Sequence, residues 1–208
     1  MNVCESSRRS RAGIEATVTS SPPRFSSGWR KSCDTLPQSL QRQQELKKDL
    51  RHSFNAAIRP VRSQDLDAIE KIENDGYTGV DRYPRELLEG YLEASRENPD
   101  VVMLIAGDSA GYVLGEITGD DRHGEIIDLA VMKQHRGQGL GRDLLERVST
   151  SLRDLGAAEI LLYVRTDNAA AIHLYETAGF EKTKDMPGYY QDGDGMQMTK
   201  RFKPAGPG

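Results

Sequence analysis

The stretch that most constrains the fold runs from Glu125 to Leu145 and reads EIIDLAVMKQHRGQGLGRDLL. Its first part, Glu125 to Met132, is rich in β-formers and almost continuously apolar, which predicts a strand buried on both faces. Apolar residues then recur at helical spacing, at Leu140, Leu144, Leu145, Val148, Leu152 and Leu155. The pattern therefore predicts a strand that passes through a short turn directly into a helix.

Three glycines, Gly137, Gly139 and Gly141, occupy that turn. They remove side chains where the first N–H groups of the helix have no partner, so backbone amides and the helix dipole can converge on an anion. This arrangement predicts a phosphate-binding turn. The alternative is a glycine-rich helix start that binds no ligand.

Two common phosphate-binding motifs do not fit this turn. A nucleotide P-loop requires Gly-x4-Gly-Lys-Ser/Thr, but Arg142 and Asp143 follow the last glycine. A dinucleotide fingerprint requires its third glycine one residue later and an acidic residue after the next strand. That strand, Glu159 to Val164, is followed by Arg165 and has no such acid.

Charge divides the chain into a basic N-terminal part and an acidic body. Through Arg51 there are ten Lys and Arg against five Asp and Glu, whereas the remainder has 18 against 27. An acidic body argues against nucleic acid as a direct partner. It favours a cationic substrate such as an amine, or it is a solubilising surface.

Apolar runs and cysteines narrow the class of protein further. No window approaches the roughly 18 apolar residues of a membrane span, which predicts a soluble protein without membrane contact. Both cysteines, Cys4 and Cys33, precede Ala56, so the body has no thiol for a disulfide, a metal site or a nucleophile. This cysteine usage is typical of a reducing compartment.

We expect a basic, disordered extension over residues 1–54, one domain over 55–203 and a short tail over 204–208. The first 36 residues are rich in serine and arginine and lack periodicity, which predicts disorder. This composition also resembles an organellar transit peptide, so targeting is the alternative to a cytoplasmic location. Gln38 to Arg51 is polar and predicts a short helix or a linker.

Hydrophobic periodicity and turn residues set the order of elements in the domain. The domain is predicted to open with a strand from Ala56, a helix capped by Ser63 and ending at Asp75-Gly76, and a helix with Pro84 at its first position and ending near Asn98. Strands over 101–107 and 111–117, joined by a hairpin, and a turn over 120–124 lead to the central strand and helix. A strand over 160–164, a helix capped by Asp167 or Asn168 and running to Ala178, and closing strands over 180–186 and 196–202 around the turn-rich PGYYQDGDG complete the domain. This order predicts an α/β (α+β) fold, with a mixed, mostly antiparallel sheet and helices on both faces.

Three motifs resemble those of one enzyme superfamily. Gln134-x-x-Gly137-x-Gly139 after a buried strand resembles the pyrophosphate-binding signature of the GNAT superfamily of N-acetyltransferases. VRTDNAAAIHLYETAGF, Val164 to Phe180, resembles a stretch of RimI-type ribosomal-protein alanine acetyltransferases and of N-terminal acetyltransferase catalytic subunits. GYYQDGDG, Gly188 to Gly195, resembles their GYY loop. The resemblance covers Ala56 to Phe202 and implies the GNAT fold, with central strands that splay apart.

The resemblance implies acetyl-CoA as cosubstrate and no metal. The turn would hold the pyrophosphate, and the pantetheine arm would pair with freed backbone groups of the central strand and contact Asn168, which can also cap its helix. Asp192 and Asp194 lack the further ligands of a calcium loop. The residues implied for cofactor binding are Leu129, Ala130, Val131, Gln134, Gly137, Gln138, Gly139, Leu140, Gly141, Arg142, Asn168 and Tyr175.

The resemblance also implies catalytic roles. Tyr175, in the LY of the second motif, would protonate the departing thiolate; otherwise it is a core tyrosine of an amphipathic helix. RimI-type enzymes carry a glutamate just before the VR, where this chain has Tyr163, a poor base near neutral pH. The base would then be Glu125, helped by Tyr163 through water, unless Glu125 is a solvated charge at the strand end. His135 and His173 are expected to be structural.

An N-terminal α-amine is the easier acceptor. At neutral pH, deprotonating a lysine costs about 3.5 kcal/mol more, because its pKa lies well above that of an α-amino group. The resemblance implies a protein or peptide N-terminus, such as that of a ribosomal protein or a nascent chain, with Tyr189 and Tyr190 walling a peptide slot or packing the sheet edge. Acetylation of a small amine and a non-catalytic acetyl-CoA-binding module are the alternatives. Oligomeric state is not predicted.

Overall fold

A computed structural model of the chain describes residues 58–77, 82–107 and 109–202. The predicted disordered extension, the polar segment from Gln38 to Arg51, the first two residues of the expected opening strand, Asp108 of the expected hairpin and the C-terminal tail lie outside these residues. The elements are β1 (Ile58–Pro60), η1 (Ser63–Asp65), α2 (Leu66–Gly76), α3 (Arg85–Glu97), β2 (Val101–Ala106), β3 (Gly111–Thr118), β4 (His123–Val131), η3 (Lys133–His135), α4 (Leu140–Asp154), β5 (Glu159–Arg165), α5 (Ala169–Thr177), β6 (Glu181–Tyr190) and β7 (Gly193–Arg201).

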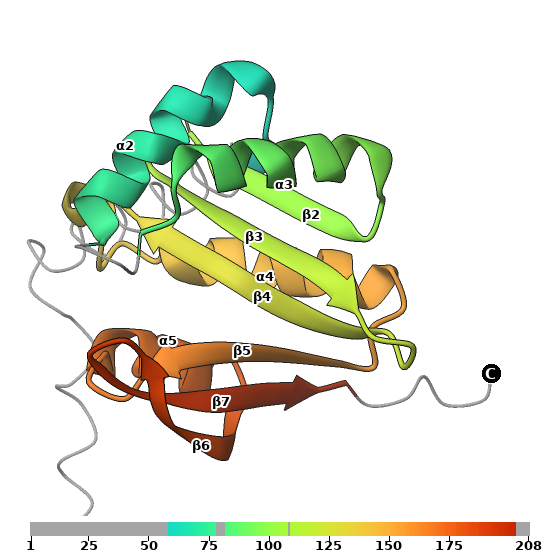
Figure 1. Ribbon diagram of the computed structural model, residues 1–208, viewed down its shortest axis with the longest axis vertical. Coiled ribbons are helices and arrows are strands. Elements are labelled where there is room, and N and C mark those ends of the chain that lie inside the picture. The colour runs from blue at the N-terminus through green and yellow to red at the C-terminus, as the bar shows by residue number, and fades with distance from the viewer. Residues whose placement is uncertain (1–57, 78–81, 108, 203–208) are drawn as a thin grey trace, which may run out of the picture.

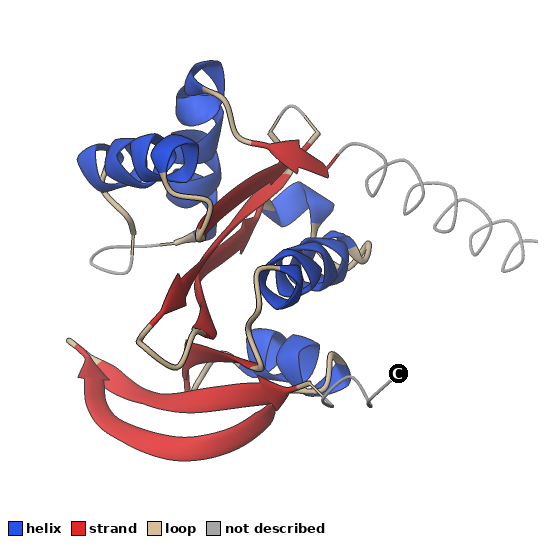
Figure 2. Cartoon of the chain, turned by 90° about the vertical axis from the view of Figure 1, so that its right-hand side faces the viewer, coloured by secondary structure: helices blue, strands red, loops and turns tan. Residues whose placement is uncertain are grey.

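The strands form one seven-stranded sheet in the order β1-β2-β3-β4-β5-β7-β6. Every neighbouring pair is antiparallel except β4 and β5, which run parallel. Helices α2 and α3 lie over one face, and α4 and α5 lie over the other (Figures 1 and 2). The predicted fold class is therefore confirmed.

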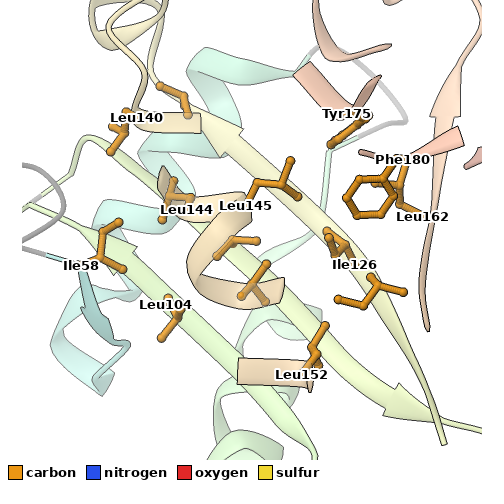
Figure 3. Packing of buried hydrophobic residues seen from close by; sticks show 14 of the residues in the cluster. Ile58, Leu104, Ile126, Leu140, Leu144, Leu145, Leu152, Leu162, Tyr175 and Phe180 are labelled. Carbon is orange, nitrogen blue, oxygen red and sulfur yellow. The ribbon is translucent and has the colours of Figure 1, made fainter. Parts of the chain in front are cut away.

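Two apolar clusters hold the helices to the sheet. The predicted apolar stripe of α4 is buried from Leu140 to Leu152, whereas Leu155, after the helix end, is half-buried. Leu140, Leu144, Leu145 and Leu152 pack over the sheet beside Ile126 and Leu162 (Figure 3). On the opposite face, Ile69, Ile72, Leu88 and Leu92 of α2 and α3 pack against the sheet. Burying an aliphatic side chain of this size contributes about 1.5–3 kcal/mol, so these stripes fix both helix layers.

The central strands separate after a short contact. β4 and β5 pair only from Gly124 to Ile126 and from Ile160 to Leu162, and the two ribbons then diverge toward their C-terminal ends (Figure 1). The second half of β4 therefore pairs with β3 alone and presents its other edge to a space between the strands.

A register shift in β4 changes which side chains face α2 and α3. Leu114 of β3 is opposite Asp128, whereas the next residue, Gly115, is opposite Ile126, so Ile127 is an extra residue in β4. As a result, Ile127 and the adjacent Asp128 both reach the α2 and α3 side. The prediction of a strand buried on both faces is wrong for Glu125, Ile127 and Leu129, which are only half-buried because they line the cleft described below.

Three predicted helix and strand starts also shift. Ser63 does not cap a long helix but begins the 3-10 turn η1, and α2 starts at Leu66 after Asp65. Pro84 is the capping residue of α3 rather than its first helical residue. β4 begins at His123, inside the predicted turn, because the Thr118 hydroxyl lies 2.8 Å from His123 Nε2 and extends the pairing with β3.

The closing hairpin is longer than predicted. β6 continues to Tyr190 and β7 begins at Gly193, so most of the turn-rich segment is strand and only Gln191 and Asp192 turn. β6 is an edge strand with two register shifts, and such a strand accepts Pro187 and Gly188 without losing a central ladder.

Candidate active site

The separation of β4 and β5 leads into a cleft of about 1300 Å³. Such a volume exceeds that of a typical site for one small ligand, so it has room for a cosubstrate and an acceptor together. Its walls come from α2 and the segment before α3, from β4, from the glycine turn, from β5 and α5, and from the β6 end. The lining includes Tyr77, Tyr83, Glu116, Glu125, Asp128, Leu129, Val131, Arg136, Gly137, Gly139, Gly141, Arg142, Tyr163, Asn168, Tyr175, Tyr189 and Tyr190.

The glycine turn has the backbone expected of a phosphate-binding turn. Gly137 and Gly139 have φ of 71° and 91°, in the left-handed region that favours glycine, and Gly139 caps α4. The first N–H groups of α4 have no partner within the helix, and the turn lines the cleft. Arg142, also on the cleft, pairs with Glu146 at 2.8 Å. The turn and the helix start therefore fit a bound pyrophosphate.

The other residues predicted to bind the cofactor are distributed unevenly. Leu129 and Val131 line the cleft, whereas the side chains of Ala130 and Leu140 are buried in the two apolar clusters. Gln138 donates from its side-chain amide to the Gln134 carbonyl at 2.9 Å, and neither residue is among those that line the cleft. Any contribution from these four residues would therefore come through the backbone or through local shape.

Two side chains hold the free end of β4. The Tyr77 hydroxyl lies 3.2 Å from the Leu129 carbonyl oxygen, and Arg136 Nε donates to the Val131 carbonyl at 2.9 Å. The sequence analysis did not single out either Tyr77 or Arg136. The Val131 carbonyl therefore has a protein partner, whereas the Leu129 carbonyl shares the single Tyr77 hydrogen with Asp128 Oδ1, which lies closer, at 2.6 Å.

Tyr175 and Asn168 both lie in the cleft, on or beside α5. Asn168 Oδ1 accepts the Ala171 N–H at 3.1 Å, so Asn168 rather than Asp167 caps α5. Tyr175 is 8% exposed and meets Phe180 edge-on, with 6.0 Å between ring centroids. Burial, followed by the charge of Asp128 and by Tyr190, raises the pKa of Tyr175, so its hydroxyl stays protonated at neutral pH.

Glu125, Tyr163, Tyr189 and Tyr190 meet at the other side of the cleft. Tyr163 stacks on Tyr189 with 4.9 Å between centroids, and Tyr189 meets Tyr190 edge-on at 5.1 Å. Glu125 stands opposite Glu116 in the β3–β4 ladder. Burial and then the Glu116 charge raise the pKa of Glu125. The structure thus brings together the predicted base, its partner and the predicted peptide wall.

The sequence analysis missed a buried acidic cluster between α2 and β4. Glu73 of α2 is 0% exposed and Asp128 of β4 is 7% exposed. The Tyr112 hydroxyl is 2.8 Å from Glu73 Oε1 and also contacts Asp128 Oδ2. Tyr77 donates its hydroxyl to Asp128 Oδ1 at 2.6 Å, and the Tyr83 N–H donates to Glu73 Oε2 at 2.8 Å.

The electrostatics of this cluster are unusual for two carboxyl groups. Burial, followed by the charge of Asp128, raises the pKa of Glu73 to about 8. Burial also raises the pKa of Asp128 against the opposing effect of its hydrogen bonds. A signal was present in the sequence, because Glu73 falls on the apolar face of its helix, seven residues after Leu66, and Asp128 interrupts an apolar strand.

The remaining polar residues named from the sequence lie as follows. His135 lines the cleft next to Gln134, and its Nε2 lies 3.2 Å from the Gln134 amide. His173 is exposed on α5 and also lines the cleft. Asp192 pairs with Arg165 at 2.7 Å, and Asp194 accepts the Gly188 N–H at 2.8 Å.

Two kinds of feature are absent from the described residues. In residues 58–77, 82–107 and 109–202, no three His, Cys, Asp or Glu side chains are grouped as a metal site requires. None of the helices in the same part of the chain is long and apolar enough to cross a membrane.

Comparison with known proteins identifies the fold's relatives. The chain is 35% identical over 148 residues to an uncharacterised N-acetyltransferase of Methanocaldococcus jannaschii, covering 71% of this chain and 92% of that protein. It is 31% identical over 152 residues to an N-alpha-acetyltransferase of Saccharolobus solfataricus, covering 69% and 91%. The crystal structure of the ribosomal-protein-S18-alanine N-acetyltransferase of Escherichia coli superposes with a TM-score of 0.60 at 29% identity, covering 72% of this chain and 95% of that one.

The family assignment rests on a match to a family profile. The sequence profile of the acetyltransferase (GNAT) family matches residues 66–180, which run from the start of α2 to the end of the segment after α5. This range contains the glycine turn, the separated strands and Tyr175, the features that build the cleft. The chain therefore belongs to the GNAT family and is an N-acetyltransferase.

Proposed function

We propose that this enzyme transfers an acetyl group from acetyl-CoA to the α-amino group of a protein or peptide N-terminus, by direct attack in a ternary complex. The observation that carries the proposal is the single cleft that joins the phosphate-binding turn of α4 to a wall of tyrosines and carboxylates. The turn suits a pyrophosphate, and the acidic wall suits an amine. The name of the Saccharolobus solfataricus relative, an N-alpha-acetyltransferase, supports the same acceptor.

The residues present fit acetyl-CoA. The left-handed glycines at the α4 start would hold the pyrophosphate, and Leu129, Val131 and Asn168 would border the pantetheine arm. When bound, acetyl-CoA supplies an acetyl thioester that is open to attack by a neutral amine.

Tyr175 would act as the acid of the reaction. As the amine nitrogen forms a bond to the acetyl carbon, the carbon–sulfur bond breaks and the thiolate takes the Tyr175 proton. None of the described residues hydrogen-bonds the Tyr175 hydroxyl, so it is free to turn toward the cosubstrate. Its raised pKa means that the proton is present at every physiological pH.

Glu125, with Tyr163, stays a candidate for removing the proton of the amine. Its carboxyl lines the cleft, and its raised pKa makes it a stronger base than an exposed glutamate. Tyr163 lines the cleft too, and its hydroxyl lies 3.5 Å from the Gln197 side-chain amide. A water that joins Tyr163 to Glu125 would therefore lie on the cleft side.

The tyrosine wall supports a peptide acceptor. Tyr189 is one of the few exposed large apolar side chains, with 48% of its surface accessible, and it stands between Tyr163 and Tyr190. Flat, amphipathic rings of this kind can border an extended peptide while their hydroxyls bond to its backbone.

The experiment is acetyl transfer from acetyl-CoA to short peptides that differ in their first two residues. An N-terminally blocked lysine peptide and a polyamine serve as comparisons. Product on free N-termini supports the proposal and gives the residue preference. Product on the polyamine alone would assign the enzyme to small amines, and acetyl-CoA binding with no product on any amine would indicate a binding module. Either result would overturn the proposal.

A further inference from the structure

The buried pair of Glu73 and Asp128 has no assigned role, yet it forms part of the cleft. Asp128 lines the cleft directly, between Glu125 and Leu129 on β4, while Glu73 lies behind it on α2. The register shift at Ile127 is what turns Asp128 to this side. Asp128 is the more exposed of the two carboxyl groups, and it stands at the wall of the active site. A purely structural role would not require that position.

The hydrogen bonds require a proton on the pair. The Tyr112 hydroxyl touches Glu73 Oε1 and Asp128 Oδ2 but carries only one hydrogen. One of those two oxygens must therefore bring its own proton, since two ionised carboxylates cannot both accept the same hydrogen. Two buried carboxyl groups this close do not ionise together in any case.

The remaining charge on the pair lacks a counterion within the protein. Of the residues that the structure describes, none forms an ion pair with Glu73 or Asp128. The titratable groups that face the pair are the hydroxyls of Tyr77 from the end of α2, Tyr83 from the segment before α3, Tyr112 from β3 and Tyr175 from α5. A buried charge without a partner is unfavourable, and a cation entering the cleft would relieve it.

We infer that the Glu73–Asp128 pair is the main proton acceptor for the substrate's ammonium group. Asp128 meets the amine at the cleft wall and takes its proton, and Glu73 is a positioning residue that acts through Asp128. The N–H bond breaks, the electron pair stays on nitrogen, and the proton joins the pair before it returns to solvent. The nitrogen is then free to attack the acetyl carbon.

The geometry places the acceptor and the donor of protons on facing walls. Asp128 is on β4 and Tyr175 is on α5, and both line the cleft where β4 and β5 have separated. The charge of Asp128 also acts on Tyr175. Burial raises the pKa of the accepting carboxyl, Asp128, toward that of an α-amino group, which makes the proton transfer less unfavourable for that class of amine.

This inference rests on the proposed function, and it competes with Glu125 for the same step. We would measure kcat and KM across the pH range for the wild-type chain and for D128N, E73Q, E125Q and E70Q, with the amine that the wild-type enzyme accepts. E70Q is the matched control, because Glu70 carries the same charge on α2 but pairs with Arg85 at the surface. If no peptide is accepted, the proposed function fails, and the pair is then tested with the small amine instead.

We expect D128N to lower kcat at least about tenfold near pH 7 and to leave the KM for acetyl-CoA within about twofold. The loss should shrink as the pH rises and more of the substrate is already neutral. E73Q should move the acidic limb of the kcat profile to higher pH, because the hydrogen bond of Glu73 lowers the pKa of Asp128 and an amide is a weaker donor than a carboxyl group. E125Q should lose less kcat than D128N, and E70Q should keep more than half of the wild-type kcat.

Three outcomes would overturn the inference. The first is a D128N enzyme that keeps wild-type kcat and its acidic limb. The second is a loss of kcat in D128N that has the same size at every pH, together with an acidic limb that does not move in E73Q. Such a result is what a structural role would produce. The third is a larger loss in E125Q than in D128N, which would assign the step to Glu125. E73Q keeps the test open if D128N does not fold.

Discussion

The protonation of Glu73 has a consequence for stability that can be measured without substrate. Glu73 is fully buried, and its pKa is raised from 4.5 to about 8, first by burial and then by Asp128. In the unfolded chain the side chain loses its proton near its ordinary pKa. Between these two values the folded state holds one proton more than the unfolded state, so stability must fall as the pH rises.

The size of the effect follows from the proton count. One extra proton in the folded state lowers the free energy of unfolding by about 1.4 kcal/mol per pH unit. From about pH 5.5 to about pH 7.5 the expected loss is therefore as much as about 3 kcal/mol. The carboxyls with lowered pKa values, Asp65, Asp121 and Asp192, are ionised in both states over this range and add no slope.

The assay is urea unfolding of the wild-type chain, E73Q and the surface control E70Q at those two pH values. Far-UV circular dichroism is the suitable signal, because the single tryptophan, Trp29, lies outside the described domain. In E73Q the titrating group is replaced by a neutral amide that can still bond to Tyr112. The difference in unfolding free energy between the two pH values should therefore be smaller in E73Q than in the wild type by about 1–3 kcal/mol, and E70Q should behave as the wild type does.

A wild-type stability that stays constant or rises over this range would refute the reasoning. So would a pH dependence of the same slope in E73Q, because that variant lacks the group to which the slope is assigned. Either result would mean that Glu73 is ionised in the folded protein at neutral pH.

Three further predictions address the rest of the site and the core. Y175F should lower kcat by about tenfold or more and leave the acetyl-CoA dissociation constant unchanged; a weakened affinity with normal turnover would remove Tyr175 from the chemistry. G139A places a side chain at φ 91°, which costs about 1–2 kcal/mol, and calorimetry should therefore show acetyl-CoA binding about tenfold weaker. Equal affinity would show that the turn does not hold the cofactor. L144A removes a side chain with 0% exposure and should reduce the free energy of unfolding by about 3–5 kcal/mol in urea; a loss below about 1 kcal/mol would mean that α4 repacks freely.

The local elements of the fold could be predicted because their signals are local. The leucine spacing of α4, the glycines before it and the Asn168 cap each act within a few residues, and each is found where the sequence places it. The boundary errors at Ser63, His123 and the β6–β7 hairpin arise where pairing with another strand, or an ion pair such as that of Arg59 and Asp65 at 2.7 Å, outweighs local propensity.

The sequence by itself determined the order of elements, the glycine turn before α4, the family and the motif that contains Asn168 and Tyr175, because these depend on short-range spacing. The tertiary structure alone decided which two carboxyl groups come together beside the cleft. Glu73 and Asp128 are 55 positions apart, and they meet only because α2 packs on the sheet and one extra residue in β4 turns Asp128 toward it. No local pattern shows how a helix packs on a sheet or where a strand shifts its register by one residue. The proton on this pair is held because the two carboxyl groups are buried and repel each other, and both effects exist only once the helix has packed and the register has shifted.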